Sequence, residues 1–177
     1  MSGNPETFIY FAYGSNMLSD RLRFRTPSCR VLGVATLAGH TLRFHKVGAD
    51  GSGKCDAFAT GLPGDIVIGV LYAIDTADMP ALDRAEGVHH GYEDATVTVT
   101  LADGTSREAV AYLATDDAID HSVAPYVWYK DFVVDGAREH DLPPAYVAHF
   151  IASVAAVPDP DPAHDRTRRA ERRRVPE

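Results

Sequence analysis

The sequence has few cysteines, no long apolar run and fewer basic than acidic residues, and each shortage excludes a class of protein. Only two cysteines occur among 177 residues, Cys29 and Cys55, so a disulfide-stapled scaffold is excluded and a reducing cytoplasm is expected. No apolar stretch approaches the roughly 20 residues that a membrane-spanning helix needs. The start of the chain has neither a basic segment nor a long apolar segment, so we expect no secretory signal.

Basic residues are outnumbered, with 17 Lys and Arg against 25 Asp and Glu and a formal charge of −8. Residues 158–177 contain six arginines and five acids, so residues 1–157 hold 11 basic and 20 acidic residues. Nucleic acids and anionic membranes are bound mainly through Lys and Arg. The negative charge of residues 1–157 therefore disfavours nucleic acids and anionic membranes as partners and favours a small-molecule ligand.

Length and composition predict one domain followed by a tail. Residues 1–157 are long enough for a single core, and 45% of the chain is hydrophobic. Residues 158–177 begin with three prolines in five residues and have few apolar side chains, so we expect a disordered tail. The arginines of this tail leave binding to RNA or to another acidic partner open as an alternative function.

Short apolar runs predict strands at residues 8–13, 30–37, 41–47, 57–62, 66–74, 95–101 and 107–113. The first run, FIYFAY, is continuous and aromatic, which is typical of a strand buried on both faces. Helical patterns begin near residues 19 and 76 and cover residues 125–138 and 146–154. We therefore expect a compact α+β domain, a small mixed β-barrel flanked by helices.

Two familiar kinds of site are disfavoured by their context. Residues 48–55, GADGSGKC, come within one residue of a phosphate-binding loop, but that loop must lead into a helix and a strand is predicted here. A hairpin loop is expected instead. The eight histidines include no HxxxH pair and the cysteines no CxxC pair, so no metal site is expected.

The segment Tyr13–Met17, YGSNM, is the first candidate for a ligand site. A buried strand ends there in a glycine turn and a helical start, which leaves backbone N–H groups free. Such groups can hold a carboxylate as readily as a phosphate. An ordinary tight turn is the alternative.

Glu86 is the second candidate. It lies seven residues after Met79 and four after Leu82, so it continues the apolar face of a predicted helix. Gly87 predicts that the helix ends next, where the helix dipole disfavours negative charge. Burial and the dipole would both favour the protonated carboxyl, which suits proton transfer at neutral pH. The alternative is a glutamate at a frayed helix end, turned to solvent.

These segments resemble the gamma-glutamylcyclotransferase family. FIYFAYGSNM resembles the family's first strand and YGSN loop, and LDRAEGV at residues 82–88 resembles the segment with its catalytic glutamate. Tyr129-Lys130, GARE at 136–139 and Leu142-Pro143 resemble its C-terminal helix and loop. The likeness runs from about Phe8 to Ile151 and implies the same barrel. It also implies a reaction without metal or cofactor, in which the α-amine of a γ-glutamyl substrate attacks its own γ-carbonyl and 5-oxoproline is released.

The resemblance also implies roles for single residues. Glu86 matches the general acid/base, Tyr129 matches a tyrosine that hydrogen-bonds the substrate, and Tyr92 matches a tyrosine that follows the EGV segment. The loop that holds the γ-glutamyl group is matched by Tyr13, Gly14, Ser15, Asn16 and Met17.

The expected substrates are γ-glutamyl amino acids or γ-glutamyl amines, including intermediates of a specialised pathway. Glutathione is disfavoured, because glutathione-specific relatives have a different residue where Asn16 stands. The alternative from another class is a binding module without catalysis that keeps the fold and the loop. Glu86 argues against it, because loss of this carboxylate would be the simplest route to such a module.

Overall fold

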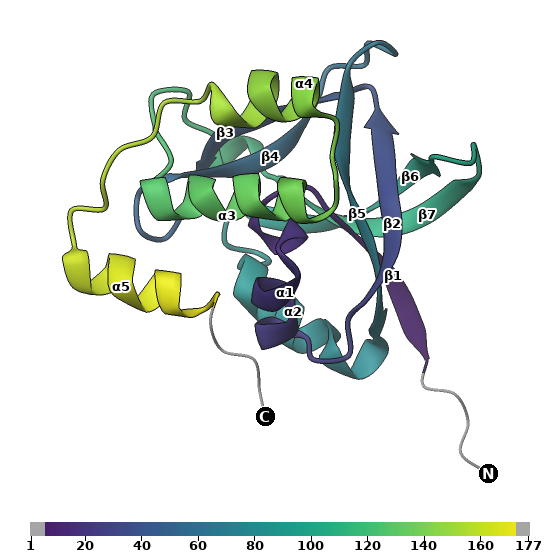
Figure 1. Cartoon of the computed structure of the whole chain (residues 1–177), viewed down its shortest axis with the longest axis horizontal. Helices are drawn as coiled ribbons and strands as arrows, with labels where there is room; N and C mark the ends of the chain where they lie inside the picture. Colours follow the sequence, from purple (N-terminus) through teal and green to yellow (C-terminus); the bar gives the residue numbers. More distant parts are fainter. Residues whose placement is uncertain (1–5, 173–177) are drawn as a thin grey trace.

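Within residues 6–172, the computed structural model contains seven strands, five of which close into a barrel (Figure 1). Around the barrel the order is β1, β5, β2, β6, β7, and neighbours are antiparallel except for β1 and β7, which are parallel. This barrel confirms the predicted α+β fold, a small mixed β-barrel flanked by helices. Its strands are β1 (Thr7–Ala12), β2 (Arg30–Ala38), β5 (Ile66–Asp75), β6 (Tyr92–Leu101) and β7 (Ser106–Ala114).

Strand β5 is central because it pairs with both β1 and β2. Its sequence, IVIGVLYAID, is almost continuously apolar, and eight of its ten residues are buried, as expected for a strand covered on both faces. At Gly69 a Cβ would lie 2.4 Å from the carbonyl oxygen of Ala12. Glycine therefore permits the close approach of β5 and β1 on which barrel closure depends.

Strands β3 (His40–Val47) and β4 (Gly53–Ala59) form a separate two-stranded ribbon. A strand, and not a helix, follows the loop at residues 48–52, as expected for a hairpin and not for a phosphate-binding loop. Strand β4 begins four residues earlier than the apolar run predicts. Its buried Asp56 accepts a 2.9 Å hydrogen bond from the Ala114 amide of β7, which ties the ribbon to the barrel.

The helices lie around the barrel, with α3 across one face and α1 beside α2 (Figure 1). At Gly136 of α3 a Cβ would lie 2.5 Å from the Leu18 amide nitrogen, so glycine lets this helix pack directly on the YGSNM segment. The helices and turns are η1 (Ser15–Met17), α1 (Ser19–Arg25), η2 (Thr76–Asp78), α2 (Met79–Glu86), η3 (Asp116–Ala118), α3 (Val127–Glu139), α4 (Pro144–Tyr146), the π-helical η4 (Val147–Ala152) and α5 (Pro162–Ala170).

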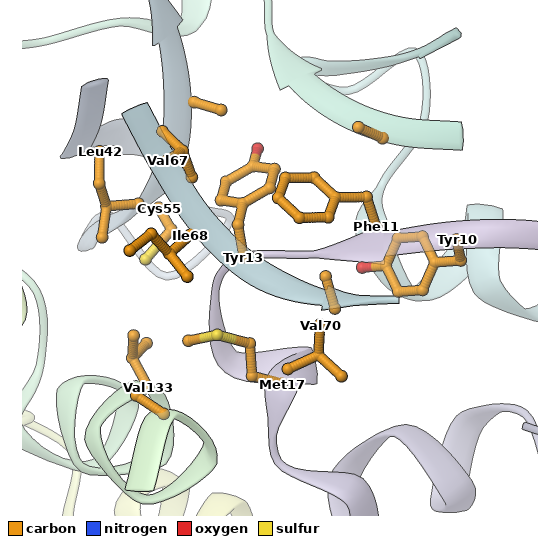
Figure 2. Packing of buried hydrophobic residues seen from close by; sticks show 14 of the residues in the cluster. Tyr10, Phe11, Tyr13, Met17, Leu42, Cys55, Val67, Ile68, Val70 and Val133 are labelled. Atoms are coloured by element: carbon orange, nitrogen blue, oxygen red, sulfur yellow. The ribbon is translucent and has the colours of Figure 1, made fainter. Parts of the chain in front are cut away.

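The core fills the barrel and the space between the barrel and α3. Figure 2 shows Phe11 and Tyr13 side by side, with ring centres 6.1 Å apart. In the same view Met17 points between Val70 of β5 and Val133 of α3, and all three are completely buried. The helices formed by residues 6–172 include none that is both long and apolar enough to cross a membrane.

The expectation of disorder after residue 157 is wrong for residues 158–172, which include helix α5. Asp161 caps this helix, and its side chain accepts hydrogen bonds from the amides of Ala163 (2.9 Å) and His164 (3.3 Å). Within the helix, Arg169 pairs with Asp165 four residues earlier, at 2.9 Å. Such caps and pairs stabilise a helix that has almost no apolar residue.

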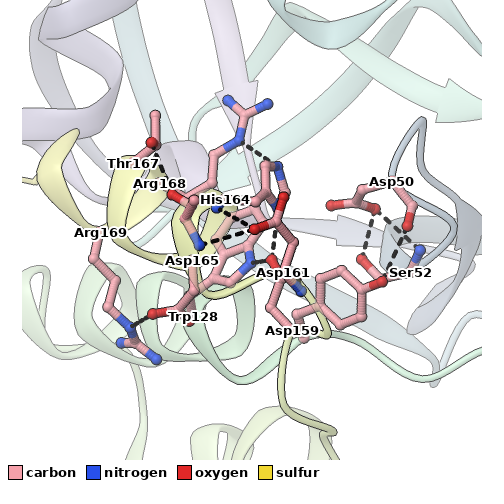
Figure 3. A network of polar contacts seen from close by, with 12 residues as sticks. Asp50, Ser52, Trp128, Asp159, Asp161, His164, Asp165, Thr167, Arg168 and Arg169 are labelled. Carbon is pink, nitrogen blue, oxygen red and sulfur yellow. Dashed lines mark hydrogen bonds and ion pairs between the residues drawn. The ribbon is translucent and has the colours of Figure 1, made fainter.

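Helix α5 is also fastened to α3 by polar contacts (Figure 3). The Trp128 indole N–H donates to Asp159 at 2.9 Å. Arg169 and Arg172 form ion pairs with Asp131 and Asp135 of α3 at 2.9 and 2.6 Å. The sequence predicts disorder for this segment because it has few apolar side chains to bury. In the structure, ion pairs and hydrogen bonds with α3 hold the segment instead. Residues 173–177, also part of the predicted tail, lie outside the described residues.

Candidate active site

The YGSNM segment leaves the end of β1 and is held by close packing. A Cβ at Gly14 would lie 3.0 Å from the Cβ of Cys55 and 3.3 Å from the Tyr129 hydroxyl. The turn closes with a 3.0 Å hydrogen bond from the Met17 amide to the Gly14 carbonyl. Among residues 6–172, no group accepts a hydrogen bond from the amides of Ser15 and Asn16. These two amides can therefore bind a ligand.

Glu86 ends α2, and Gly87 follows in the left-handed conformation, as the sequence predicts. The Glu86 side chain is 16% exposed, so it does not turn freely to solvent. Its Oε1 atom accepts hydrogen bonds from Asn16 at 2.6 Å and from the Arg25 guanidinium at 2.9 Å. Arg25 also donates to the Asn16 side-chain oxygen, at 2.9 Å. The nearest hydrogen-bond partners of this partly buried carboxylate are a cation and an amide.

The two oxygens of this carboxylate differ. Both hydrogen bonds go to Oε1, and no donor within residues 6–172 reaches Oε2. Arg25 and Asn16 thus fix the orientation of Glu86 while its second oxygen remains free for a ligand.

The three tyrosines that the sequence predicts for the site, Tyr13, Tyr92 and Tyr129, lie around the same small recess as Glu86. Tyr92 donates to the Cys55 carbonyl, and Tyr129 accepts from the Cys55 amide at 3.0 Å, so both are fixed against β4. Tyr13 donates to the Tyr112 carbonyl of β7. Burial raises the pKa of Tyr13, Tyr92 and Tyr129 well above its usual value, so all three hydroxyls stay protonated at neutral pH.

These residues line a small inner recess of about 30 Å³. Met17 does not line it, since its side chain is completely buried, and the place of Met17 in the loop that holds the γ-glutamyl group stays a prediction. Burial raises the pKa of the Cys55 thiol at the recess to about 12, so Cys55 is not a thiolate nucleophile at neutral pH. The lining residues are Tyr10, Tyr13, Gly14, Ser15, Asn16, Cys55, Glu86, Tyr92, Tyr112 and Tyr129.

The recess opens into an outer cleft of about 380 Å³. Ser15, Glu86, Tyr92 and Tyr129 line both, so Glu86 lies where the recess meets the cleft. The cleft is lined by six Lys and Arg side chains and by two carboxylates, although the whole chain is acidic. The cations are Arg21, Arg25, Lys46, Lys54, Arg84 and Arg168.

Three residues of the recess and cleft, Tyr10, Arg21 and Arg25, are not among the site residues that the sequence predicts. Arg21 and Arg25 are four residues apart on α1, directly after the YGSNM segment, and this spacing places both on one helix face. Arg21 is buried and donates to the Ser15 hydroxyl at 3.1 Å. Tyr10 accepts a 3.0 Å hydrogen bond from Asn16. The four-residue spacing of Arg21 and Arg25 is the one feature of the sequence that could have predicted a role for these two arginines.

Metal ligands do not gather in the part of the chain that the structure describes. In residues 6–172 no three side chains of His, Cys, Asp or Glu are arranged to hold an ion. His89 and His90 lie in the exposed turn after α2, and His90 reaches the rim of the outer cleft. Glu86 itself offers one oriented carboxylate beside free amides and neutral hydroxyls.

A closed barrel with a single carboxylate between a tyrosine-lined recess and an open cleft is the arrangement of an enzyme that acts on a small molecule. Comparisons with known proteins agree. Residues 66–150 match the AIG2-like family. Gamma-glutamylcyclotransferases of Bos taurus and Homo sapiens are each 35% identical to this chain in an alignment of 151 residues, and the matches cover 82% and 81% of this chain and 78% and 77% of theirs.

A solved structure shows the same fold. The protein named gamma-glutamyl cyclotransferase superposes with a TM-score of 0.76 at 31% identity, over 86% of this chain and 90% of that chain. The chain belongs to the gamma-glutamylcyclotransferase family. This confirms the resemblance drawn from FIYFAYGSNM and LDRAEGV, and with it the predicted class of enzyme.

Proposed function

We propose that this gamma-glutamylcyclotransferase acts on γ-glutamyl amino acids or amines and releases 5-oxoproline, with Glu86 as the general acid/base. The observation that carries the proposal is the free Oε2 atom of an otherwise fixed carboxylate at the mouth of the recess. The expected place of action is the cytoplasm. A role in glutathione metabolism is proposed through γ-glutamyl products of that tripeptide's turnover, and not through glutathione itself.

The reaction is intramolecular. At neutral pH the α-amine of the substrate is an ammonium, and Glu86 accepts one of its protons through Oε2. The freed amine attacks the γ-carbonyl carbon, and a new C–N bond closes the five-membered ring. The bond from that carbon to the leaving nitrogen then breaks as Glu86 returns the proton to this nitrogen, and the ring nitrogen gives its second proton to the departing amine, so that 5-oxoproline and an ammonium are released. Folding the substrate so that its two ends meet supplies much of the acceleration.

The recess provides the groups for this folding. The free amides of Ser15 and Asn16 can donate to the substrate's α-carboxylate or to the oxyanion that forms on the γ-carbonyl. Tyr129 stays neutral and accepts from the Cys55 amide, so its O–H can act as a donor without adding charge, whereas Tyr92 already donates its O–H to the Cys55 carbonyl. Arg25 has a different role, because it touches Glu86 and Asn16 and positions the carboxylate.

The substitution Glu86→Gln tests this mechanism. Glutamine keeps the size of the side chain but cannot accept the proton, so we expect kcat to fall by about 10² or more. The measurement is release of 5-oxoproline from γ-glutamyl-alanine, γ-glutamyl-lysine and glutathione, with the first two expected to react faster than the third.

Thermal unfolding of the variant serves as the control for folding. Full activity of Glu86→Gln would contradict the role of Glu86. Absence of turnover with every substrate would contradict the activity itself, and saturable binding of γ-glutamyl-alanine without turnover would indicate the binding module instead.

A further inference from the structure

The charge of the outer cleft is opposite to that of the chain. Six cationic side chains and two carboxylates line it, on a protein with a formal charge of −8. The cations come from five separate elements, α1, β3, β4, α2 and α5, which fold from distant parts of the sequence. Because the recess holds the γ-glutamyl group in the proposed reaction, the cleft outside it receives the leaving group.

Four of the six cations have a carboxylate partner. The pairs are Arg25 with Glu86 at 2.9 Å, Lys54 with Asp50 at 2.9 Å, and Arg21 and Arg168 with the shared Glu171, the latter at 2.8 Å. These pairs leave Lys46 and Arg84 as the two cleft cations that face no carboxylate within 4 Å among residues 6–172.

Lys46 is the stronger indication, because it is 95% buried and no carboxylate of the described residues lies within 4 Å of its ammonium. Its ammonium donates one long hydrogen bond, 3.4 Å, to the His90 carbonyl, and lies 4.5 Å from the centre of the Tyr92 ring. Burial lowers the pKa of Lys46, and the nearby Glu86 partly opposes this. A lysine is almost never buried without a partner, so the missing carboxylate points to a ligand. Tyr92 lines both recess and cleft, which places the ammonium beside the exit toward the leaving group.

Arg84 belongs to the wall of the cleft formed by α2. It lies two residues before Glu86, and its exposed guanidinium forms no hydrogen bond or ion pair with the described residues. The guanidinium can therefore bind a carboxylate without breaking an existing contact. Lys46 and Arg84 line the same cleft as Glu86, from β3 and from α2.

We infer that the cleft selects leaving groups with two acidic groups, that is, dicarboxylic amino acids such as glutamate, through Lys46 and Arg84. This inference rests on the proposed cyclotransferase activity. A leaving amine without a carboxylate would leave both cations unpaired, and a neutral amino acid would satisfy one of them. A dicarboxylic leaving group pairs with both, while the free amides of the YGSNM segment remain for the γ-glutamyl part.

The test compares substrates of equal size and different charge. We expect kcat/KM for γ-glutamyl-glutamate to exceed that for γ-glutamyl-glutamine by about tenfold or more, since a hydrogen bond to a charged group is worth roughly that factor. Lys46→Gln and Arg84→Gln should each reduce this ratio. The matched control is Arg107→Gln. Arg107 is exposed and lies near the end of β7 that is farther from the site.

Two failures are distinguishable. If no γ-glutamyl substrate releases 5-oxoproline, the proposed activity itself is wrong. If γ-glutamyl-alanine reacts but the ratio of glutamate to glutamine substrates is near one, or is unchanged in Arg84→Gln, the inference about the cleft is overturned. Arg84 is exposed and contacts no partner, so this variant keeps the test decisive even if Lys46→Gln fails to fold.

Discussion

At the scale of single residues, small size decides where the active loop lies. Gly14 and Gly136 have no strained backbone angle, and each is needed because another segment comes too near for a side chain. Gly14 faces β4 and Tyr129, and Gly136 faces the backbone of Met17 and Leu18. The position of the YGSNM segment thus depends on two glycines from different parts of the chain.

Gly136→Ala should therefore damage both stability and activity. Its Cβ would lie 2.5 Å from the Leu18 amide and 2.7 Å from the Met17 carbonyl carbon, so α3 or the loop must shift. Such overpacking costs about 1–3 kcal/mol or more, which outweighs the roughly 1 kcal/mol that alanine gains over glycine in a helix, so we expect a net fall in the free energy of unfolding. Urea unfolding and kcat/KM with γ-glutamyl-alanine measure the two effects.

Gly64→Ala is the matched control for this substitution. A Cβ at Gly64 meets no atom within 4 Å, and its φ is not in the left-handed region, so we expect no loss of stability or activity. Equal stability of Gly136→Ala and Gly64→Ala would show that the contact of α3 with the loop is not tight.

At the scale of elements, most strands and the end of α2 could be predicted, because they depend on local patterns. The FIYFAY run is a buried strand, and Gly87 ends the helix directly after Glu86 as expected. The surroundings of Glu86 could not be predicted, since Arg25 reaches it across 61 residues of sequence. Helix α5 was missed for a similar reason. Its stabilising partners lie on α3, and composition alone does not reveal them.

Helix α5 supports the site from outside, and Glu171→Gln tests this. Glu171 pairs with Arg21, whose side chain is 5% exposed and whose pKa burial lowers to about 10. Loss of the charged partner would leave a buried cation with a hydrogen bond to the Ser15 hydroxyl and contacts with the Trp128 and Phe132 rings, but with no carboxylate. We expect the free energy of unfolding to fall by about 3 kcal/mol, as is typical when one member of a buried pair is removed. Urea unfolding measures it.

The control for Glu171 is Glu108→Gln, an exposed glutamate of β7 that forms no ion pair with the described residues. This variant should leave stability within about 0.5 kcal/mol of the parent. If Glu171→Gln behaves like the control, α5 does not contribute to the stability of the site.

At the scale of the whole molecule, the net charge of the chain and the local charge of the outer cleft predict opposite effects on an anionic substrate. A chain with a formal charge of −8 repels an anionic substrate, whereas the cationic cleft attracts it over the last few ångströms. Composition therefore disfavours nucleic acids as partners, and it does not reveal a basic site. The arginines and lysines of the cleft are few in number and become neighbours only in the folded chain.

The salt dependence of kcat/KM distinguishes the effect of the net charge from the effect of the cationic cleft. Added KCl screens charges beyond about 10 Å at 0.1 M, so it weakens whichever field governs capture of the substrate. If the cleft dominates, kcat/KM for γ-glutamyl-glutamate should fall several-fold between low salt and about 0.2 M KCl, and less for γ-glutamyl-glutamine. If the net charge dominates, kcat/KM should rise instead. Arg84→Gln should reduce the salt dependence and Arg107→Gln should not, because only Arg84 lines the cleft.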